Sequence, residues 1–289
     1  MSFDRRDWQS KLVLLLVLPA TAINVVLQAS AWMGIDARAV AWTLGLSAAL
    51  GLAAWALRSG TPAAAMTGAV VNASLMFSTA EVPFAPWRTA AVPVLTFMAI
   101  TSLATRFGRA RKERLGTAEK RHGRGAAQVA ANLGLAALVS TWAVRMWAAN
   151  AASIRWHATL PFFVIGLAAL AEAAADTVSS EVGQVLGGTP RLLTTLRRVP
   201  PGTDGGITLA GSLAGILAAG LVAGAGTLAL QGGMAMLAIA WAGAVFGLFF
   251  DSLLGATLER AGGLNNDAVN FLSTASAAGV AVGLMAAMR

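Results

Sequence analysis

The chain has 289 residues, of which 57% are hydrophobic and only 12% are charged, and its mean hydropathy is +0.68. About 25% of the residues of a soluble domain are charged, so this composition excludes a soluble globular protein and indicates an integral membrane protein. The sequence contains no cysteine, which excludes disulfides, thiolate metal ligands and a thiol nucleophile. The net charge of +8 is expected from basic loops on the cytoplasmic side of a membrane, and we therefore expect no nucleic-acid binding.

The apolar runs predict membrane-spanning helices, because each span needs about 20 apolar residues and the alternating pattern of barrel strands is missing. In chain order, helices are predicted at 11–33, 36–58, 62–80, 89–106, 125–149, 157–186, 206–230, 234–259 and 267–288. Some of these runs can be half-helices or can merge. The expected fold is an all-α, polytopic transmembrane helix bundle of about seven to nine helices, forming a single integral membrane domain over residues 1–289.

The basic residues predict the orientation of this bundle. Residues 107–124 form the densest basic segment and are expected to be a cytoplasmic loop. Counting helices from this segment places the N-terminus, the turn at Arg58 and the loops 187–206 and 260–268 on the same side. Most of the unusual polar residues then lie at or near one face of the membrane, which is typical of a functional site.

Three carboxylates follow or interrupt the apolar run of helix 157–186, namely Glu172, Asp176 and Glu181. Ionisable residues within a membrane helix are costly and rare, so they are candidates for function. We interpret Asp176 and Glu181 as catalytic residues and metal ligands. The alternative is that Glu172 and Asp176 pair with a buried base such as Arg145 or Arg155.

The segment 187–206, GGTPRLLTTLRRVPPGTDGG, is the predicted active-site loop. Arginine forks match phosphate oxygens, and glycines permit close approach of backbone N–H groups to an anion. The residues interpreted as phosphate ligands here are Arg191, Arg197, Arg198, Gly205 and Gly206, with Arg198 also assigned a catalytic role. Asp204 is interpreted as a catalytic residue and metal ligand, or else as the cap of the next helix. For Arg191 the alternative is lipid-headgroup anchoring.

A second oxygen-rich cluster is predicted near the end of helix 234–259 and the start of helix 267–288. Asp251 is interpreted as a catalytic residue and metal ligand, and Asp267 as a further metal ligand. Because the ligands are hard oxygens and the chain has no cysteine and two histidines, Mg²⁺ is the expected metal. Asn72, Asn266 and Asn270 are added as candidate phosphate ligands. The alternative for Asn266 and Asp267 is simple helix capping.

Four segments carry a resemblance to a known family: ADTVSSEVG, PRLLTTLRRVPPGTDGG, DSLLGATLE and NNDAVNFLS. They closely resemble blocks of a family of integral membrane proteins that includes animal transmembrane protein 19 and the chloroplast phytyl-phosphate kinase. RSGTPAAAMTGAVVN and AEKRHGRGAAQVAAN resemble weaker blocks, so that the resemblance covers roughly 58–275. Leu133 departs from the glycine that usually follows Ala-Asn in the family. Thr203 and Asn132, which lie within these segments, are further candidate phosphate ligands.

The resemblance implies a nucleotide-dependent kinase that converts a prenyl monophosphate of phytyl or geranylgeranyl type into the diphosphate. It implies CTP or ATP as co-substrate, a lipid prenyl phosphate and membrane lipids as partners, and the inner (plasma) membrane of a bacterium as the location. The alternatives are a CTP-dependent cytidylyltransferase or a polyprenol kinase, and, from another class, a transporter of an anionic metabolite or lipid. A transporter is usually built from an inverted repeat, and none is visible between the two halves.

Overall fold

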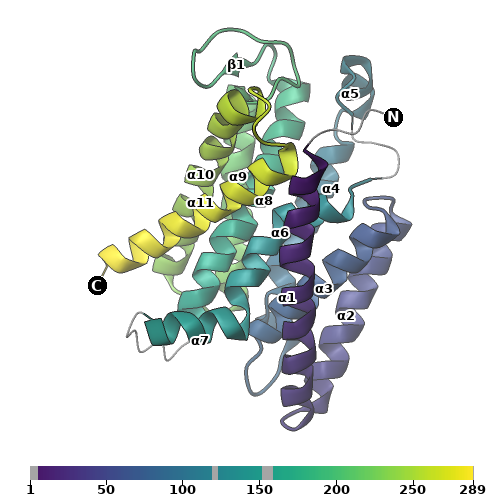
Figure 1. Ribbon diagram of the computed structural model, residues 1–289, viewed down its shortest axis with the longest axis vertical. Coiled ribbons are helices and arrows are strands. Elements are labelled where there is room, and N and C mark those ends of the chain that lie inside the picture. Colours follow the sequence, from purple (N-terminus) through teal and green to yellow (C-terminus); the bar gives the residue numbers. More distant parts are fainter. Residues whose placement is uncertain (1–5, 119–122, 152–158, 289) are drawn as a thin grey trace.

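A computed structural model describes residues 6–118, 123–151 and 159–288. Arg155 lies outside the described residues. The elements are α1 (Asp7–Met33), α2 (Ala37–Ala56), α3 (Pro62–Ser78), η1 (Pro86–Arg88), α4 (Ala91–Arg106), α5 (Arg109–Leu115), α6 (Ala126–Ser140), α7 (Trp142–Ala151), α8 (Thr159–Leu186), β1 (Arg191–Leu192), β2 (Gly206–Ile207), α9 (Leu209–Ala229), α10 (Met234–Leu254), η2 (Gly255–Glu259) and α11 (Asn266–Ala287). The predicted all-α polytopic fold is confirmed (Figure 1).

Six of the described helices are long and apolar enough to cross a membrane: α1, α2, α8, α9, α10 with η2, and α11. The count rises to eight if each of two bent helix pairs is one span. One of these pairs divides the predicted helix 125–149 into α6 and α7, which meet at an angle of 54°. The break lies at Thr141, whose backbone is extended (ψ 148°) and whose hydroxyl donates to the carbonyl of Leu138 at 2.8 Å.

The second bent pair is α4 and α5, which meet at 62°. Gly108 stands between them with φ +60°, a left-handed conformation that suits glycine. The predicted basic loop 107–124 therefore begins with a short helix, α5, which turns away from the end of α4. A side chain at position 108 would collide with Val185 on α8, only 2.5 Å from the built Cβ.

Helix α8 is the centre of the bundle. It packs against α9, α10, α11, α6 and α4, and 78% of its most apolar stretch is buried. Small residues permit this packing: a Cβ at Gly215 of α9 would lie 2.8 Å from the carbonyl oxygen of Ala175, and one at Gly226 would lie 2.5 Å from Leu167. The carboxylates of α8 are therefore surrounded by protein.

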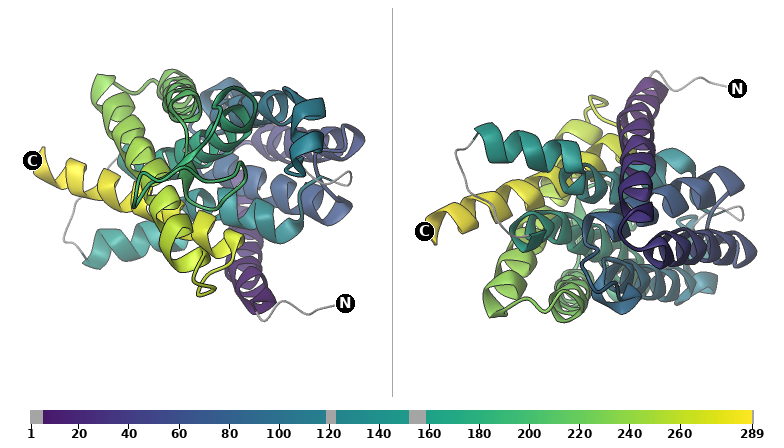
Figure 2. Two further views of the ribbon diagram at one scale, coloured as in Figure 1. Left: turned by 90° about the horizontal axis from the view of Figure 1, so that it is seen from above. Right: turned by 90° about the horizontal axis from the view of Figure 1, so that it is seen from below.

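The basic segments gather at one end of the molecule. The start of α1, helix α5, the β1–β2 loop and the start of α11 all lie at the top of Figure 1, whereas the α1–α2 turn and α7 lie towards the other end. The same end is seen from above in the left panel of Figure 2, where the β1–β2 loop crosses over the helices. The predicted clustering of the polar loops at one face is therefore observed, while the side of the membrane on which they lie stays a prediction.

Candidate functional site

Two packed helices bring two carboxyl groups together, with a third within electrostatic range. The side chains of Asp176 on α8 and Asp251 on α10 interact, and Glu172, about one turn further into α8, lies within electrostatic range of both. Glu172 is only 1% exposed. Asp251 Oδ1 and Glu172 Oε1 are buried and accept no hydrogen bond from the described residues. Two of the predicted site residues thus meet, with acceptor oxygens available to a cation or a donor.

Gly247 makes this arrangement possible. A Cβ at position 247 would lie 2.5 Å from Cγ of Glu172 and 3.0 Å from the carbonyl oxygen of Ser273 on α11. The absence of a side chain on α10 therefore allows the Glu172 side chain to fit between three helices. The sequence shows this glycine only as part of an apolar run, VFGLFFD, and offers no signal for its role.

Glu181 has a different environment from Asp176. Its Oε2 lies 2.5 Å from Nζ of Lys112 on α5, and that ammonium also donates to the carbonyls of Ala104 and Thr105 at the end of α4. Lys112 is 1% exposed, so this is a buried ion pair. Its evident task is to hold α5 against α4 and α8. The catalytic and metal-binding roles of Glu181 stay predictions. The sequence did not indicate that Lys112 would be its ionic partner.

Arg124 is the cation that faces Asp176. Its positive charge acts on that carboxyl, and its Nη2 lies 3.5 Å from the hydroxyl of Thr177. Arg145, one of the bases suggested as a partner, donates to the carbonyl of Ser78 at 3.1 Å. Arg124 belongs to the predicted basic loop 107–124, and its sequence position indicates no role in the site.

The backbone of Arg124 is fixed by the turn between α2 and α3. Its N–H donates to the carbonyl of Ser59 at 3.1 Å, and its carbonyl accepts from Thr61 at 3.0 Å. Gly123 has φ +70°, and a Cβ there would lie 2.5 Å from the backbone of Ser59. The two weaker sequence blocks, RSGTP and GRG, therefore join directly, and this junction sets Arg124 at the site.

The loop 187–206 folds into a small structure of its own. Strands β1 and β2 pair antiparallel, with Arg191 opposite Ile207. Arg191 Nη1 donates to the carbonyl of Leu196 at 3.0 Å. The hydroxyl of Thr203 donates to the carbonyl of Pro200 at 2.7 Å, and the N–H of Gly206 donates to the carbonyl of Thr203 at 2.9 Å. These predicted phosphate ligands use polar groups within the loop, whereas the side chains of Arg197 and Arg198 are exposed.

Gly205 seats this loop on the end of α10. Its φ is +71°, and a Cβ there would lie 2.2 Å from the backbone nitrogen of Ala256 in η2. A Cβ at Gly255 would likewise lie 2.7 Å from the nitrogen of Gly205. Gly205 thus permits close approach to protein backbone, and η2 is a π-helical turn just four residues beyond Asp251, a feature that is frequent at functional sites.

A polar depression of about 650 Å³ lies beside this junction. Its lining includes Arg6, Asp204, Glu259, Asn266 and Asp267. Asp267 accepts a hydrogen bond from Ser10 on α1 at 2.6 Å. Asn266 and Asp267 were the alternative caps of α11, but Asn265 caps this helix. Asp204 was the alternative cap of α9, but Thr208 caps that helix.

Two other predicted phosphate ligands bind each other. Asn270 Nδ2 on α11 donates to Asn132 Oδ1 on α6 at 3.0 Å, and both side chains are buried. Asn72 on α3 donates to the hydroxyl of Ser47 on α2 at 2.8 Å. These amides link helices within the bundle, and Asn72 also lines a pocket.

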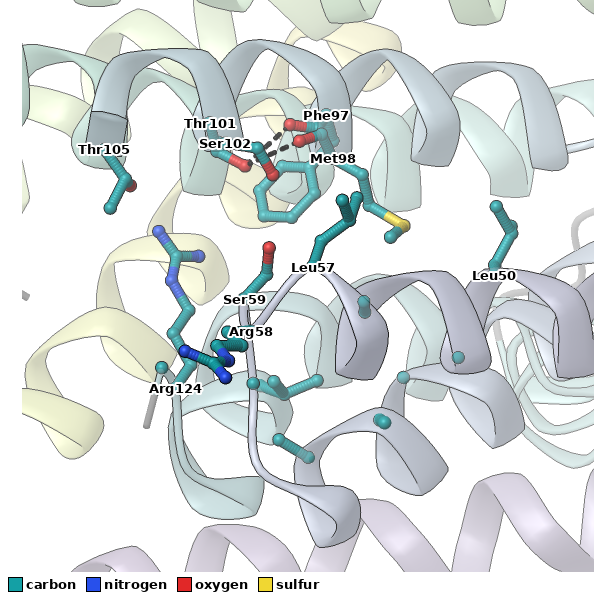
Figure 3. A pocket seen from close by; sticks show the side chains of 18 of the residues that line it. Leu50, Leu57, Arg58, Ser59, Phe97, Met98, Thr101, Ser102, Thr105 and Arg124 are labelled. Carbon is teal, nitrogen blue, oxygen red and sulfur yellow. Dashed lines mark hydrogen bonds between the residues drawn. The ribbon is translucent and has the colours of Figure 1, made fainter. Parts of the chain in front are cut away.

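That pocket, of about 540 Å³, lies between α2, α3, α4 and α6. Figure 3 shows Arg58 and Arg124 at one end, Phe97, Met98 and Thr101 on the α4 side, and Leu50 at the other end. Its mouth also includes Arg106 and Arg109. The pocket is therefore cationic where it meets the polar end of the bundle and largely apolar further in.

The acidic side chains allow a simple test of the expected metal. Among the described residues, no three His, Asp or Glu side chains gather to hold an ion. Mg²⁺ commonly takes only one or two carboxylates and completes its shell with water and substrate phosphates. Asp176 and Asp251, with the unpartnered Oδ1 of Asp251, fit that manner of binding.

The bundle, its six to eight candidate spans and the carboxyl groups within them define a polytopic integral membrane protein with a polar site at one end. The chain belongs to the integral membrane protein DUF92 family, whose model matches residues 45–278. No solved structure matches the chain.

Relatives occur in archaea, cyanobacteria and plants. An uncharacterised membrane protein of Methanocaldococcus jannaschii is 44% identical over 108 residues, covering 37% of this chain and 45% of the relative. An uncharacterised membrane protein of Synechocystis is 33% identical over 210 residues, covering 67% of this chain and 72% of the relative. Protein VTE6, chloroplastic, of Arabidopsis thaliana is 30% identical over 192 residues, covering 65% and 56%. The chain thus spans about half the length of the archaeal and plant relatives.

Proposed function

We propose that the protein is a membrane-embedded prenyl-phosphate kinase, which transfers a phosphoryl group from a nucleoside triphosphate to a lipid monophosphate of phytyl or geranylgeranyl type. The observation that supports this most is the junction at Arg124. Arg124 lines an arginine-rimmed pocket, and its guanidinium lies 3.5 Å from the hydroxyl of Thr177, the residue next to Asp176 of the half-buried Asp176–Asp251 carboxyl pair. The similarity to VTE6, and the resemblance to the family of the phytyl-phosphate kinase, point in the same direction.

The proposed reaction is an in-line displacement. An oxygen of the lipid monophosphate attacks the γ-phosphorus of the nucleotide, the bond from that phosphorus to the β-phosphate oxygen breaks, and the nucleoside diphosphate leaves. The second pKa of a phosphate monoester is about 6, so the acceptor is already ionised at neutral pH and needs no general base. The main obstacle is the repulsion between two anionic phosphates.

The residues of the site address this repulsion. Arg124 places a fixed positive charge beside Asp176, where it can bind an oxygen of either phosphate. Asp176 and Asp251 would hold Mg²⁺, which supplies charge neutralisation and alignment of the phosphates when bound. Arg197 and Arg198 are exposed on the loop above and are available to the nucleotide from the aqueous side. The proposal therefore places this end in the cytoplasm, where nucleotides are found, and the chain in the plasma membrane of a bacterium.

Product analysis tests the proposal against its alternatives. Purified protein is incubated with γ-labelled ATP or CTP and a panel of prenyl phosphates and prenols, and the lipids are separated by chromatography. A kinase of the proposed type gives labelled prenyl diphosphate and unlabelled nucleoside diphosphate. A cytidylyltransferase gives labelled pyrophosphate and a CDP-lipid, and a polyprenol kinase labels the alcohol; either outcome would refute the proposed reaction.

A further inference from the structure

We propose that the pocket between α2, α3, α4 and α6 is the seat of the lipid acceptor, and that it takes a single-chained lipid monophosphate with the phosphate at Arg58, Arg106 and Arg124. The identity of the ligand as the acceptor rests on the proposed function. The binding site itself rests on the structure, because the arginines and the apolar wall belong to one cavity.

The charge at the mouth comes from four separate elements of the chain. Arg58 follows α2, Arg106 ends α4, Arg109 begins α5 and Arg124 precedes α6. Arg106 Nη2 also donates to the carbonyl of Leu57 at 3.3 Å, so it reaches across the slot from α4 to the end of α2. Glu113, paired with Arg109 at 2.9 Å, is the one acidic residue among the described residues of the lining, and these residues give the mouth a net positive charge that suits a doubly charged phosphate.

The wall of the pocket follows α4 away from this mouth. Its lining runs from Arg106 back to Val94, twelve residues that span about 18 Å at about 1.5 Å per residue. Phe97, Met98 and Leu50 provide the apolar surface at this depth (Figure 3). An elongated apolar cavity beneath a cationic mouth matches a lipid chain below a phosphate group.

The packing of the helices explains why the slot exists. Helix α4 packs mainly against α8 and α9, whereas α2 packs mainly against α3. The α2–α3 hairpin and α4 therefore make few contacts with each other, and a lipid can enter between them from the membrane. The volume of about 540 Å³ is typical of a pocket for one small molecule, so a single prenyl chain fits better than a phospholipid with two acyl chains.

Position 68 offers a way to fill the slot without disturbing the fold. Gly68 lines the pocket, and a Cβ there would meet only Val129, at 3.9 Å. Gly68→Leu should therefore project into the cavity, and leucine is a better helix former than glycine. The matched control is Gly45→Leu on α2, where a Cβ meets nothing within 4 Å and the residue is exposed outside the pocket.

The test is equilibrium binding, which does not depend on turnover. Labelled geranylgeranyl phosphate is bound to the purified protein in nanodiscs and competed with geranylgeraniol, inorganic phosphate, geranyl phosphate or phosphatidic acid. Unlabelled geranylgeranyl phosphate should compete at least about tenfold more tightly than the alcohol or inorganic phosphate, since it alone uses both the mouth and the wall. Equal competition by phosphatidic acid would mean that the arginines bind lipid headgroups in general, and would overturn the proposal.

The variants locate the site. Arg58→Gln and Arg106→Gln should each weaken geranylgeranyl phosphate about tenfold, the scale of one lost charge-assisted hydrogen bond, whereas Arg111→Gln on α5, outside the pocket lining, should not. Gly68→Leu should weaken geranylgeranyl phosphate at least about tenfold and leave the shorter geranyl phosphate within about twofold. If Gly68→Leu behaves like Gly45→Leu, the prenyl chain of the lipid binds elsewhere.

The two proposals can fail separately. Selective binding without phosphoryl transfer would refute the kinase but support the lipid site in this pocket. Phosphoryl transfer that is insensitive to these variants would support the kinase but refute the lipid site.

Discussion

Arg124 Nη2 lies 3.5 Å from the hydroxyl of Thr177, across 53 residues of sequence. The contact joins the start of α6 to the central helix α8, next to Asp176. It brings the arginine-rimmed pocket and the half-buried carboxyl pair, Asp176 and Asp251, to a common boundary. A donor and an acceptor phosphate placed on either side of this boundary would meet at one guanidinium.

The buried pair of Lys112 and Glu181 allows a structural role to be separated from a catalytic one. Lys112→Met should destabilise the protein by about 3–5 kcal/mol, because it leaves the Glu181 carboxylate buried without its partner. The double variant Lys112→Met with Glu181→Leu should recover most of this loss, since neither charge then remains. Thermal unfolding in detergent measures both effects. If the double variant is stable but inactive, Glu181 has the catalytic role assigned from the sequence.

Gly205 should be among the residues of the loop that tolerate substitution least. Gly205→Ala and Gly188→Ala both place a side chain at a left-handed position, with φ +71° and +65°, at a cost of about 1–2 kcal/mol each. Only Gly205→Ala also meets a neighbour, the backbone of Ala256, whereas position 188 is open. We expect Gly205→Ala to cost a further 1–3 kcal/mol or so, seen as a lower Tm. Equal Tm values for the two variants would show that the loop does not rest on η2 as described.

Arg198 and Asp204 test whether the loop binds nucleotide. Arg198→Lys keeps the charge but loses the planar fork, and should cost about 1–3 kcal/mol, or roughly 5- to 150-fold in rate, if the guanidinium binds two phosphate oxygens. Asp204→Asn should raise the Mg²⁺ concentration needed for half-maximal rate if that carboxylate holds the metal. Arg38→Lys, at an exposed arginine at the start of α2, is the control. Wild-type kinetics in both loop variants would show that the loop is a structural turn that binds neither nucleotide nor metal.

The orientation of the bundle is a further prediction. Reporter fusions after Arg58 and within 107–124, 190–204 and 260–266 should all report a cytoplasmic position, because the basic segments gather at one end and basic loops stay inside. A periplasmic signal from 190–204 would separate the loop arginines from cytoplasmic nucleotide. That result would be incompatible with the proposed kinase.

The spans and the gathering of polar loops could be predicted from the sequence because hydropathy and basic charge act locally. The contacts that define the site could not. In the sequence, Lys112 is one of several basic residues in a predicted loop, yet the bend at Gly108 buries its side chain. Gly247 is part of a predicted apolar span, yet its lack of a side chain leaves space for Glu172. Both depend on which helices pack together, and no local pattern carries that information.

The same limit applies to the arginines. The sequence drew attention to Arg191, Arg197 and Arg198 because they stand together in one loop with prolines and glycines. The arginines of the pocket mouth come from four elements, and contacts such as the junction of Ser59 with Gly123 and Arg124 bring these elements together. The resemblance covered both segments, RSGTP and GRG, without indicating that they touch.

The proposed metal-dependent kinase is tested by the transfer of labelled γ-phosphate to geranylgeranyl phosphate, followed with and without metal. We expect labelled geranylgeranyl diphosphate from the wild type, no product in EDTA, and recovery with Mg²⁺ or Mn²⁺, since the site offers hard oxygens. Asp176→Asn and Asp251→Asn should each abolish transfer while the protein still folds, and Asp36→Asn, which keeps a competent cap on α2, should not. Full transfer by both carboxylate variants, or transfer unaffected by EDTA, would contradict the assignment of Asp176 and Asp251 as the metal-binding centre of a phosphoryl transfer.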